Sequence, residues 1–227
     1  MRRSFNAIAL IAIIFIASCA IPISATAQNI GLEKLENFLK ITKTGRAEFT
    51  QTVTSPAREG QAVKIKKSSG VFEFSRPNRF KFIYKKPFEQ SLVADGQTLW
   101  MYDVDLNQVS ASKQANVLAS TPAALIASAP DLKTLQQSFN LKAEPDKDGQ
   151  AWVLATPKLQ EGSLQNIRVG FKLAASGQPG GELSTLDILD SFGQRSVMSF
   201  QKFEINPALG ADSFNFKPPA GVDVIKQ

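Results

Sequence analysis

The chain has 227 residues, of which 43% are hydrophobic, and a formal net charge of +6. This length and composition fit one all-β domain or at most two small domains. The sequence has no histidine and a single cysteine, Cys19, which excludes the usual nucleophile–base pairs and most zinc and redox sites. We therefore expect no cofactor and no metal. The lysines are spread along the chain instead of clustering, which indicates solvated strand faces and no nucleic-acid partner.

The first 27 residues have the pattern of an export signal. Two N-terminal arginines precede the apolar run 7–17, and Ala25-Thr26-Ala27 forms a small-x-small cleavage site. The apolar run is too short for a comfortable membrane span. We expect a signal peptide over residues 1–27, cleavage after Ala27, release into the periplasm, and one mature domain over residues 28–227.

Cys19 leaves a second interpretation of the N-terminus open. Ile16-Ala17-Ser18-Cys19 resembles a bacterial lipobox, in which Cys19 would be lipidated and become the new N-terminus. The product would then be anchored to a membrane. The absence of a long linker after Cys19 argues mildly against this alternative.

An amphipathic helix begins the mature chain. Over residues 30–41, Leu32, Leu35, Phe38 and Leu39 recur at three- and four-residue steps, which predicts about three helical turns. Alternating residues then predict a strand over 47–53, a polar loop over 55–61, and a second strand around 63–67.

Residues 70–109 predict a twisted antiparallel meander with one strongly aromatic side. Aromatic residues occupy every second position of two consecutive segments: Phe72 and Phe74 in the first, and Phe80, Phe82 and Tyr84 in the second. Because strand side chains alternate between faces, Arg76 shares a face with Phe72 and Phe74. Asp95-Gly96 suits a tight hairpin turn.

Two short helices are predicted after the meander. Thr121 suits an N-cap and Pro122 the first helical position of a helix ending near Ser128, and Asp131 begins another helix that extends to Gln137. Neither helix is long enough to be stable alone. We expect both to lie on the aromatic face of the sheet.

The rest of the chain returns to strands and ends in an extended tail. The predicted strands cover residues 139–143, 150–155, 163–173, 182–189 and 194–205, and prolines stop the tail that begins at Phe214. The sequence thus predicts a mainly β domain of nine to eleven strands with three short helices.

Four motifs resemble the outer-membrane lipoprotein carrier protein family of Gram-negative bacteria, LolA. They are Arg76-Pro77-Asn78-Arg79-Phe80, the hairpin from Asp95 to Asp103, Thr121-Pro122 with Leu125-Ile126, and the tail Phe214-x-Phe216-x-Pro218-Pro219-x-Gly221-Val222. They follow one another in order over essentially the whole mature chain.

The resemblance implies an open antiparallel half-barrel of about eleven strands, covered by a lid of short α-helices. It implies an apolar cavity that holds the acyl chains of lipoproteins. A carrier of this kind takes its cargo from an inner-membrane lipoprotein-releasing ABC transporter and passes it to an outer-membrane lipoprotein receptor. Direct transfer of cargo from the cavity of one protein to that of the next is simplest for a monomer.

Arg76 is the residue most directly connected to a lid. A guanidinium on an apolar face needs acceptors, and the last carbonyls of a short helix lack helical partners. Ile126 and Ala127 near the end of the predicted lid helix could supply these carbonyls. In the similar family, the arginine at this motif position latches the lid and lets go when lipid enters. The alternative is that Arg76 only ends a strand and points to solvent.

The expected lining of the acyl cavity combines the aromatic sheet face with lid residues. The set is Leu35, Phe38, Phe49, Phe72, Phe74, Phe80, Phe82, Trp100, Leu125 and Ile126. Any single aromatic residue could instead fill an ordinary β core, and Trp100 could anchor its hairpin.

Three function classes remain open from the sequence. The first is a soluble periplasmic lipoprotein carrier, and the second is a membrane-anchored receptor or insertion factor of similar fold, lipidated at Cys19. The third is an enzyme such as a hydrolase. The chain has neither a Gly-x-Ser-x-Gly elbow nor a histidine, so we expect no enzymatic activity.

Overall fold

The structure is a computed structural model, and it describes residues 30–57, 60, 62–115, 122–127, 129–159, 162–173 and 182–226. The predicted signal peptide, its cleavage site at Ala27 and the alternative lipidation site at Cys19 lie outside the described residues. So do Thr121 and Ser128 at the ends of the predicted lid helix.

Short helices and long strands make up the described chain. The helices are α1 (Ile30–Ile41), α3 (Pro122–Ala127) and α4 (Leu132–Ser138). The strands are β1 (Thr44–Ser55), β2 (Lys64–Ser75), β3 (Arg79–Lys86), β4 (Gln90–Ala94), β5 (Thr98–Asp103), β6 (Gln108–Lys113), β7 (Phe139–Lys147), β8 (Gln150–Pro157), β9 (Leu164–Lys172), β10 (Leu183–Asp190), β11 (Arg195–Ile205) and β12 (Asp223–Lys226).

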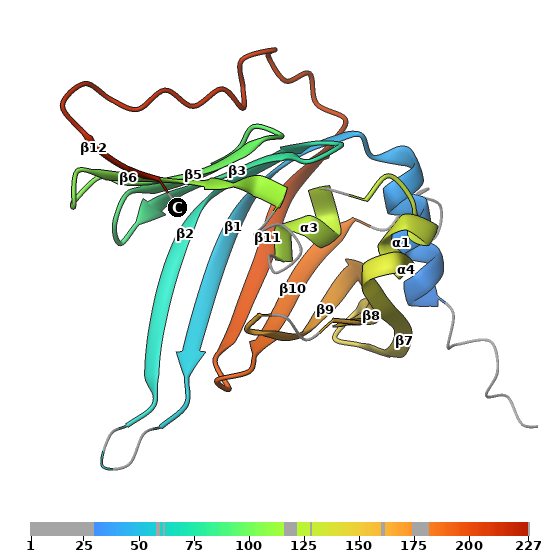
Figure 1. The fold of residues 1–227 in the computed structure, drawn as a ribbon. Helices are drawn as coiled ribbons and strands as arrows, with labels where there is room; N and C mark the ends of the chain where they lie inside the picture. Colours follow the sequence, from blue (N-terminus) through green and yellow to red (C-terminus); the bar gives the residue numbers. More distant parts are fainter. Residues whose placement is uncertain are drawn as a thin grey trace, which may run out of the picture.

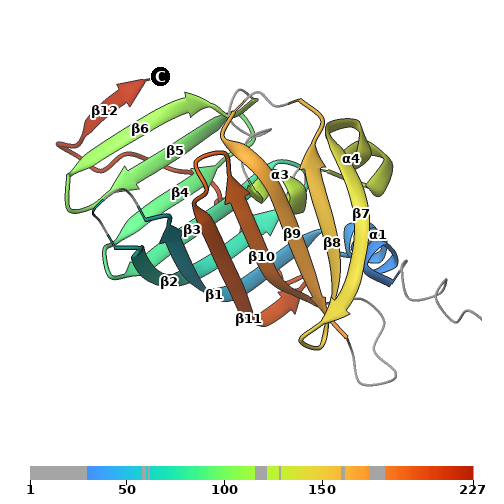
Figure 2. The ribbon, with the colours of Figure 1, turned by 90° about the horizontal axis from the view of Figure 1, so that it is seen from below.

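The strands form one sheet of 12 strands in the order β12-β6-β5-β4-β3-β2-β1-β11-β10-β9-β8-β7. Neighbouring strands run antiparallel except β12, which pairs parallel to β6. The sheet curves strongly, and its two ends, β12 and β7, do not pair with each other (Figures 1 and 2). The predicted open, mainly antiparallel fold is confirmed, with one strand more than expected because the tail adds β12.

The predicted segments 63–67 and 70–76 form one continuous strand. β2 pairs with β1 without interruption from Thr44↔Ser75 to Ser55↔Lys64. Its pairing with β3 shifts by one residue between Ser69 and Gly70. A Cβ atom at Gly70 would lie 2.0 Å from the carbonyl oxygen of Ile83, so the close approach of the two strands requires glycine here.

The helices lie against the concave side of the sheet. Figure 1 shows α3 inside the curve, with α1 and α4 beside β7 and β8. A Cβ atom at Gly31 would lie 2.2 Å from the carbonyl oxygen of Trp152, so the first turn of α1 touches the β8 backbone directly. Leu35, Phe38 and Leu39 of α1 are buried against the sheet, as the apolar periodicity predicts.

The C-terminal segment covers part of the outer face of the sheet (Figure 1). Phe214 is only 3% exposed, and its ring lies below the charged groups of Arg79 and Lys81. Phe216 packs against Trp100 and Tyr102, with ring centroids 5.5 and 6.2 Å apart. The tail therefore covers a small outer core before β12 joins β6.

Candidate functional site

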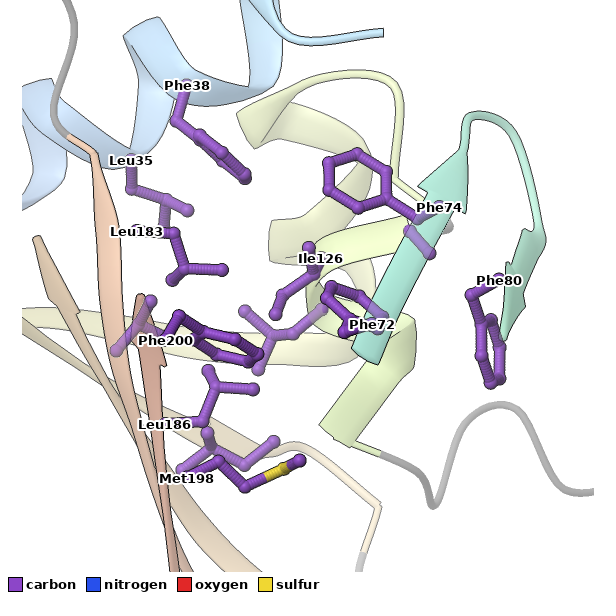
Figure 3. Close-up of a cluster of buried hydrophobic side chains, with 14 of the residues drawn as sticks. Leu35, Phe38, Phe72, Phe74, Phe80, Ile126, Leu183, Leu186, Met198 and Phe200 are labelled. Atoms are coloured by element: carbon purple, nitrogen blue, oxygen red, sulfur yellow. The ribbon is translucent and has the colours of Figure 1, made fainter. Parts of the chain in front are cut away.

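Nine of the ten residues expected to line a cavity lie in one buried cluster on the concave face, part of which Figure 3 shows. They are Leu35, Phe38, Phe49, Phe72, Phe74, Phe80, Phe82, Leu125 and Ile126. The aromatic rings touch one another closely, with centroids 4.4 Å apart for Phe72 and Phe82 and 5.6 Å for Phe72 and Phe200. In this conformation the helices and the sheet fill the interior with their own side chains.

Trp100 is the exception, and its assignment to the cavity is corrected by the structure. Leu99, its neighbour in β5, packs against the concave cluster. Trp100 therefore points to the outer face, where its ring packs on Phe216. Its indole nitrogen donates to Asp95 Oδ2 at 2.9 Å, which fixes the hairpin turn. Its position agrees with the alternative of a hairpin anchor.

Arg76 leaves the end of β2 and reaches the ends of two helices. Its Nε atom donates to the carbonyl oxygen of Ile126 in α3 at 2.7 Å. Its Nη1 atom donates to the carbonyl oxygen of Thr42, just after α1, and lies 3.4 Å from that of Phe38. Carbonyls in and just after the last turn of a helix generally lack helical partners, although that of Phe38 also accepts from the backbone nitrogen of Thr42 at 3.0 Å. One side chain thus connects the sheet to both α1 and α3.

The guanidinium of Arg76 is held in apolar surroundings. Its central carbon lies 4.8 Å from the ring centroid of Phe38 and 5.1 Å from that of Phe74. Burial lowers the pKa of Arg76 to about 10, so the group stays charged at neutral pH. Its Nη2 atom has no hydrogen-bond partner among the described residues. Because one nitrogen of this buried cation lacks an acceptor, the closed arrangement is less stable than one in which every nitrogen of the guanidinium donated a hydrogen bond.

The turn after Arg76 holds the lid at a second point. The backbone nitrogen of Asn78 donates to the carbonyl oxygen of Ala127 at 2.9 Å, while Asn78 itself takes a φ of 64°. Ala127, expected as an acceptor for the arginine, thus receives this backbone hydrogen bond. Both expected acceptors thus accept hydrogen bonds from the turn after β2: Ile126 from the Arg76 side chain and Ala127 from the Asn78 backbone.

The side chain of Gln114 holds this turn by a hydrogen bond, a role that the sequence did not suggest. It follows β6 and is 2% exposed. Its Nε2 atom donates to the carbonyl oxygen of Asn78 at 2.5 Å, and its Oε1 atom accepts from the backbone nitrogen of Gly96 at 2.9 Å. Nothing in its spacing marks a buried glutamine, since it follows the polar residues Ser112 and Lys113. The carbonyls of Phe38 and Thr42 were missed because any residue type can supply a backbone oxygen.

Among the described residues, no group of three acidic, cysteine or histidine side chains is placed to hold a metal ion. None of the helices in the described part of the chain is both long and apolar enough to cross a membrane.

Comparison with known proteins agrees with the fold and the motifs. Residues 40–217 match the family described as outer membrane lipoprotein carrier protein LolA, which is more than half of the chain. The chain belongs to the LolA family.

Curated LolA relatives match the chain over most of their own length. An outer-membrane lipoprotein carrier protein from Albidiferax ferrireducens is 66% identical over 197 residues, covering 87% of this chain and 91% of the relative. The corresponding protein from Methylibium petroleiphilum is 50% identical over 196 residues, covering 86% and 89%. LolA proteins are carriers and not enzymes, so the hydrolase alternative is set aside.

One solved structure is similar to this chain at the level of the fold alone. The crystal structure of a protein from Desulfovibrio piger superposes with a TM-score of 0.50 at 10% identity, covering 82% of this chain and 95% of that chain.

Proposed function

We propose that this protein carries lipoproteins through the periplasm with their acyl chains held between the concave face of the sheet and the helices α1 and α3. The aromatic cluster of Phe72, Phe74, Phe82 and Phe200 is the surface that the chains would cover. Membership of the LolA family and the names of the relatives support this cargo.

The observation that carries the proposal is the position of Arg76. It joins the sheet to the ends of α1 and α3 by hydrogen bonds that a few ångströms of helix displacement would break. Opening would expose the aromatic rings that now pack on one another. Acyl chains would replace those ring contacts and stabilise the open form.

Release of a tightly bound acyl chain requires such a competing closed form. Each buried methylene contributes about 0.8 kcal/mol, so a chain of about fifteen methylenes could gain about 12 kcal/mol. A cavity that always stood open would release such a ligand very slowly. In the closed form, the collapsed rings and the Arg76 hydrogen bonds offset part of this gain, so cargo can be passed on.

The partners follow from the same proposal. The inner-membrane lipoprotein-releasing ABC transporter would supply the cargo, an outer-membrane lipoprotein receptor would accept it, and the carrier would act as a monomer. The protein would be exported and cleaved after Ala27. The anchored receptor lipidated at Cys19 is the alternative.

The test is intact mass and lipid content of the protein purified from a periplasmic fraction. The proposal expects a soluble form that begins at Gln28 and carries lipoprotein. A membrane-bound form beginning at a triacylated Cys19 would move the assignment to the anchored receptor. A soluble form that never binds acyl chains would contradict both.

A further inference from the structure

Polar side chains follow the aromatic ones on the concave face of β1. Side chains of a strand alternate between its two faces, so Gln51 follows Phe49 on the concave side. The register places Gln51 opposite Met198 of β11 and Ser68 of β2. Met198 belongs to the buried cluster and lies beyond Phe200, further from α1 (Figure 3). Gln51 is therefore the first polar side chain that β1 presents beyond the apolar cluster.

The side-chain amide of Gln51 connects β1 to both neighbouring strands. Its Nε2 atom donates to Ser196 Oγ of β11 at 2.7 Å, and its Oε1 atom accepts from Ser68 Oγ of β2 at 3.3 Å. All three side chains are half-buried. The two hydrogen bonds thus hold the amide in place at the end of the apolar cluster.

These hydrogen bonds leave two donors unused at this end of the cluster. An amide NH₂ group has two hydrogens, and within the described part of the chain only the one directed at Ser196 has an acceptor. The Ser196 hydroxyl accepts from Gln51, and its own hydrogen has no acceptor among the described residues. Gln51 and Ser196 can therefore each donate one further hydrogen bond.

We propose that Gln51 and Ser196 bind the carbonyl groups through which the acyl chains are attached to the cargo. The inference rests on the proposed function, because it needs acyl chains in the aromatic cluster. An acyl chain ends in a carbonyl group, which accepts hydrogen bonds and cannot donate them. A carbonyl that reaches the edge of an apolar cluster loses bound water, and a hydrogen bond from the protein offsets that loss. Gln51 thereby sets the depth to which the chains enter.

The test compares two fluorescent peptides that carry two chains of equal length, attached by ester bonds in one peptide and by ether bonds in the other. The ether peptide lacks the carbonyl oxygens. We expect wild-type protein to bind the ester peptide about fivefold more tightly. Gln51→Met keeps a side chain of similar length but has no amide donor, so it should reduce this preference to less than about twofold.

Two control variants separate binding of the carbonyl from support of the sheet. Ser68→Ala removes the hydrogen bond to Gln51 Oε1 but leaves both donors, so it should keep the preference for the ester. Gln201→Met makes the same substitution at an exposed position of β11 and should keep it as well. A loss of preference in Ser68→Ala equal to that in Gln51→Met would show that Gln51 only holds the strands together, and would overturn the inference.

A measurement on the wild-type protein covers the case in which Gln51→Met does not fold. The NMR signals of the Gln51 side-chain NH₂ group should shift more with the ester peptide than with the ether peptide. Equal shifts, or equal affinities of the wild type for the two peptides, would overturn the inference and leave the proposed function intact. If neither peptide binds to the wild type, the proposed function fails and the inference fails with it.

Discussion

The Nε atom of Arg76 donates a hydrogen bond of 2.7 Å to the carbonyl oxygen of Ile126, which lies fifty residues later in the chain. This contact joins the end of a core strand to the last turn of a six-residue helix. A helix of that length has little stability of its own. Its position on the sheet therefore depends strongly on this hydrogen bond and on burial of Leu125 and Ile126.

Replacing Arg76 by leucine should reduce the fraction of cargo that is released to an acceptor. The variant keeps an apolar side chain over Phe38 and Phe74 but loses the hydrogen bonds that favour the closed lid. Hydrogen bonds to charged groups contribute about 1.5–3 kcal/mol, and in the wild type they stabilise the closed, empty form. Without them, the equilibrium constant for transfer of cargo to an acceptor should fall about tenfold or more. Transfer of a fluorescent acylated peptide from loaded protein to acceptor vesicles measures this.

Arg76→Lys is the matched control for the latch. Lysine keeps the charge but has one ammonium in place of the guanidinium fork, so it can reach fewer of the carbonyls of Ile126 and Thr42 at once. We expect transfer between that of wild type and that of Arg76→Leu. A transfer equilibrium equal to that of the wild type in the leucine variant would show that Arg76 does not govern release.

Gln114→Leu should loosen the turn that holds the lid. The substitution leaves the carbonyl oxygen of Asn78 and the backbone nitrogen of Gly96 without their side-chain partner, at a cost of about 1–3 kcal/mol. Hydrogen exchange of the Asn78 amide, which donates to Ala127, should become at least tenfold faster. Gln201→Leu, at an exposed position of β11, should leave that exchange unchanged, and equal rates in both variants would contradict the role of Gln114.

The repeating parts of this fold could be predicted from the sequence, whereas the site could be predicted only in part. The alternation of Phe72, Phe74, Phe80 and Phe82 predicts a buried strand face, because period-two patterns act locally. Arg76 stands out for a related reason, since a cation on an apolar face needs acceptors. The carbonyls of Phe38 and Thr42 depend on where α1 ends in space, and no side-chain pattern encodes that position.

Trp100 shows where reasoning from residue type fails. A large aromatic residue within an aromatic meander suggests the concave core, but its register places it on the outer face. Phe216 of the C-terminal tail packs on Trp100 at that face, so a large aromatic residue is also covered there. A contact between residues more than a hundred positions apart is invisible to local patterns.

Glu73 should make the stability of the fold sensitive to acid. Its carboxylate lies 2.7 Å from Arg46 Nε and 2.8 Å from Lys81 Nζ on the outer face. Burial opposes ionisation, but hydrogen bonds from Lys81 and Arg46 outweigh it and hold the pKa of Glu73 below its usual 4.5. The unfolded chain therefore binds this proton more readily, so the stabilisation is present above the unfolded pKa and is lost as the pH falls through the folded pKa.

Urea unfolding of wild type and Glu73→Gln at several pH values measures this effect. The urea midpoint of the wild type should fall more steeply than that of the variant between about pH 5 and pH 3. At neutral pH the wild type should be the more stable of the two. Parallel pH profiles would show that Glu73 has the same pKa in both states.

Phe214→Ala should destabilise the fold through the outer core. The ring is 3% exposed and packs below Arg79 and Lys81, so its removal should lower the free energy of unfolding by about 3 kcal/mol. Phe192→Ala is the control, since Phe192 is 77% exposed and should change stability by less than about 0.5 kcal/mol. Similar urea midpoints for both variants would show that the tail does not stabilise the sheet.

The most direct test of the latch is the NMR signal of the Arg76 Nε–H group, with and without a saturating acylated peptide. The signal is assigned by its absence in Arg76→Lys, since lysine has no such group. In the free protein the bond to Ile126 should protect this proton from exchange with water. We predict that acyl chains abolish the protection as the lid opens. Peptide that binds while the Arg76 proton remains equally protected would contradict the latch.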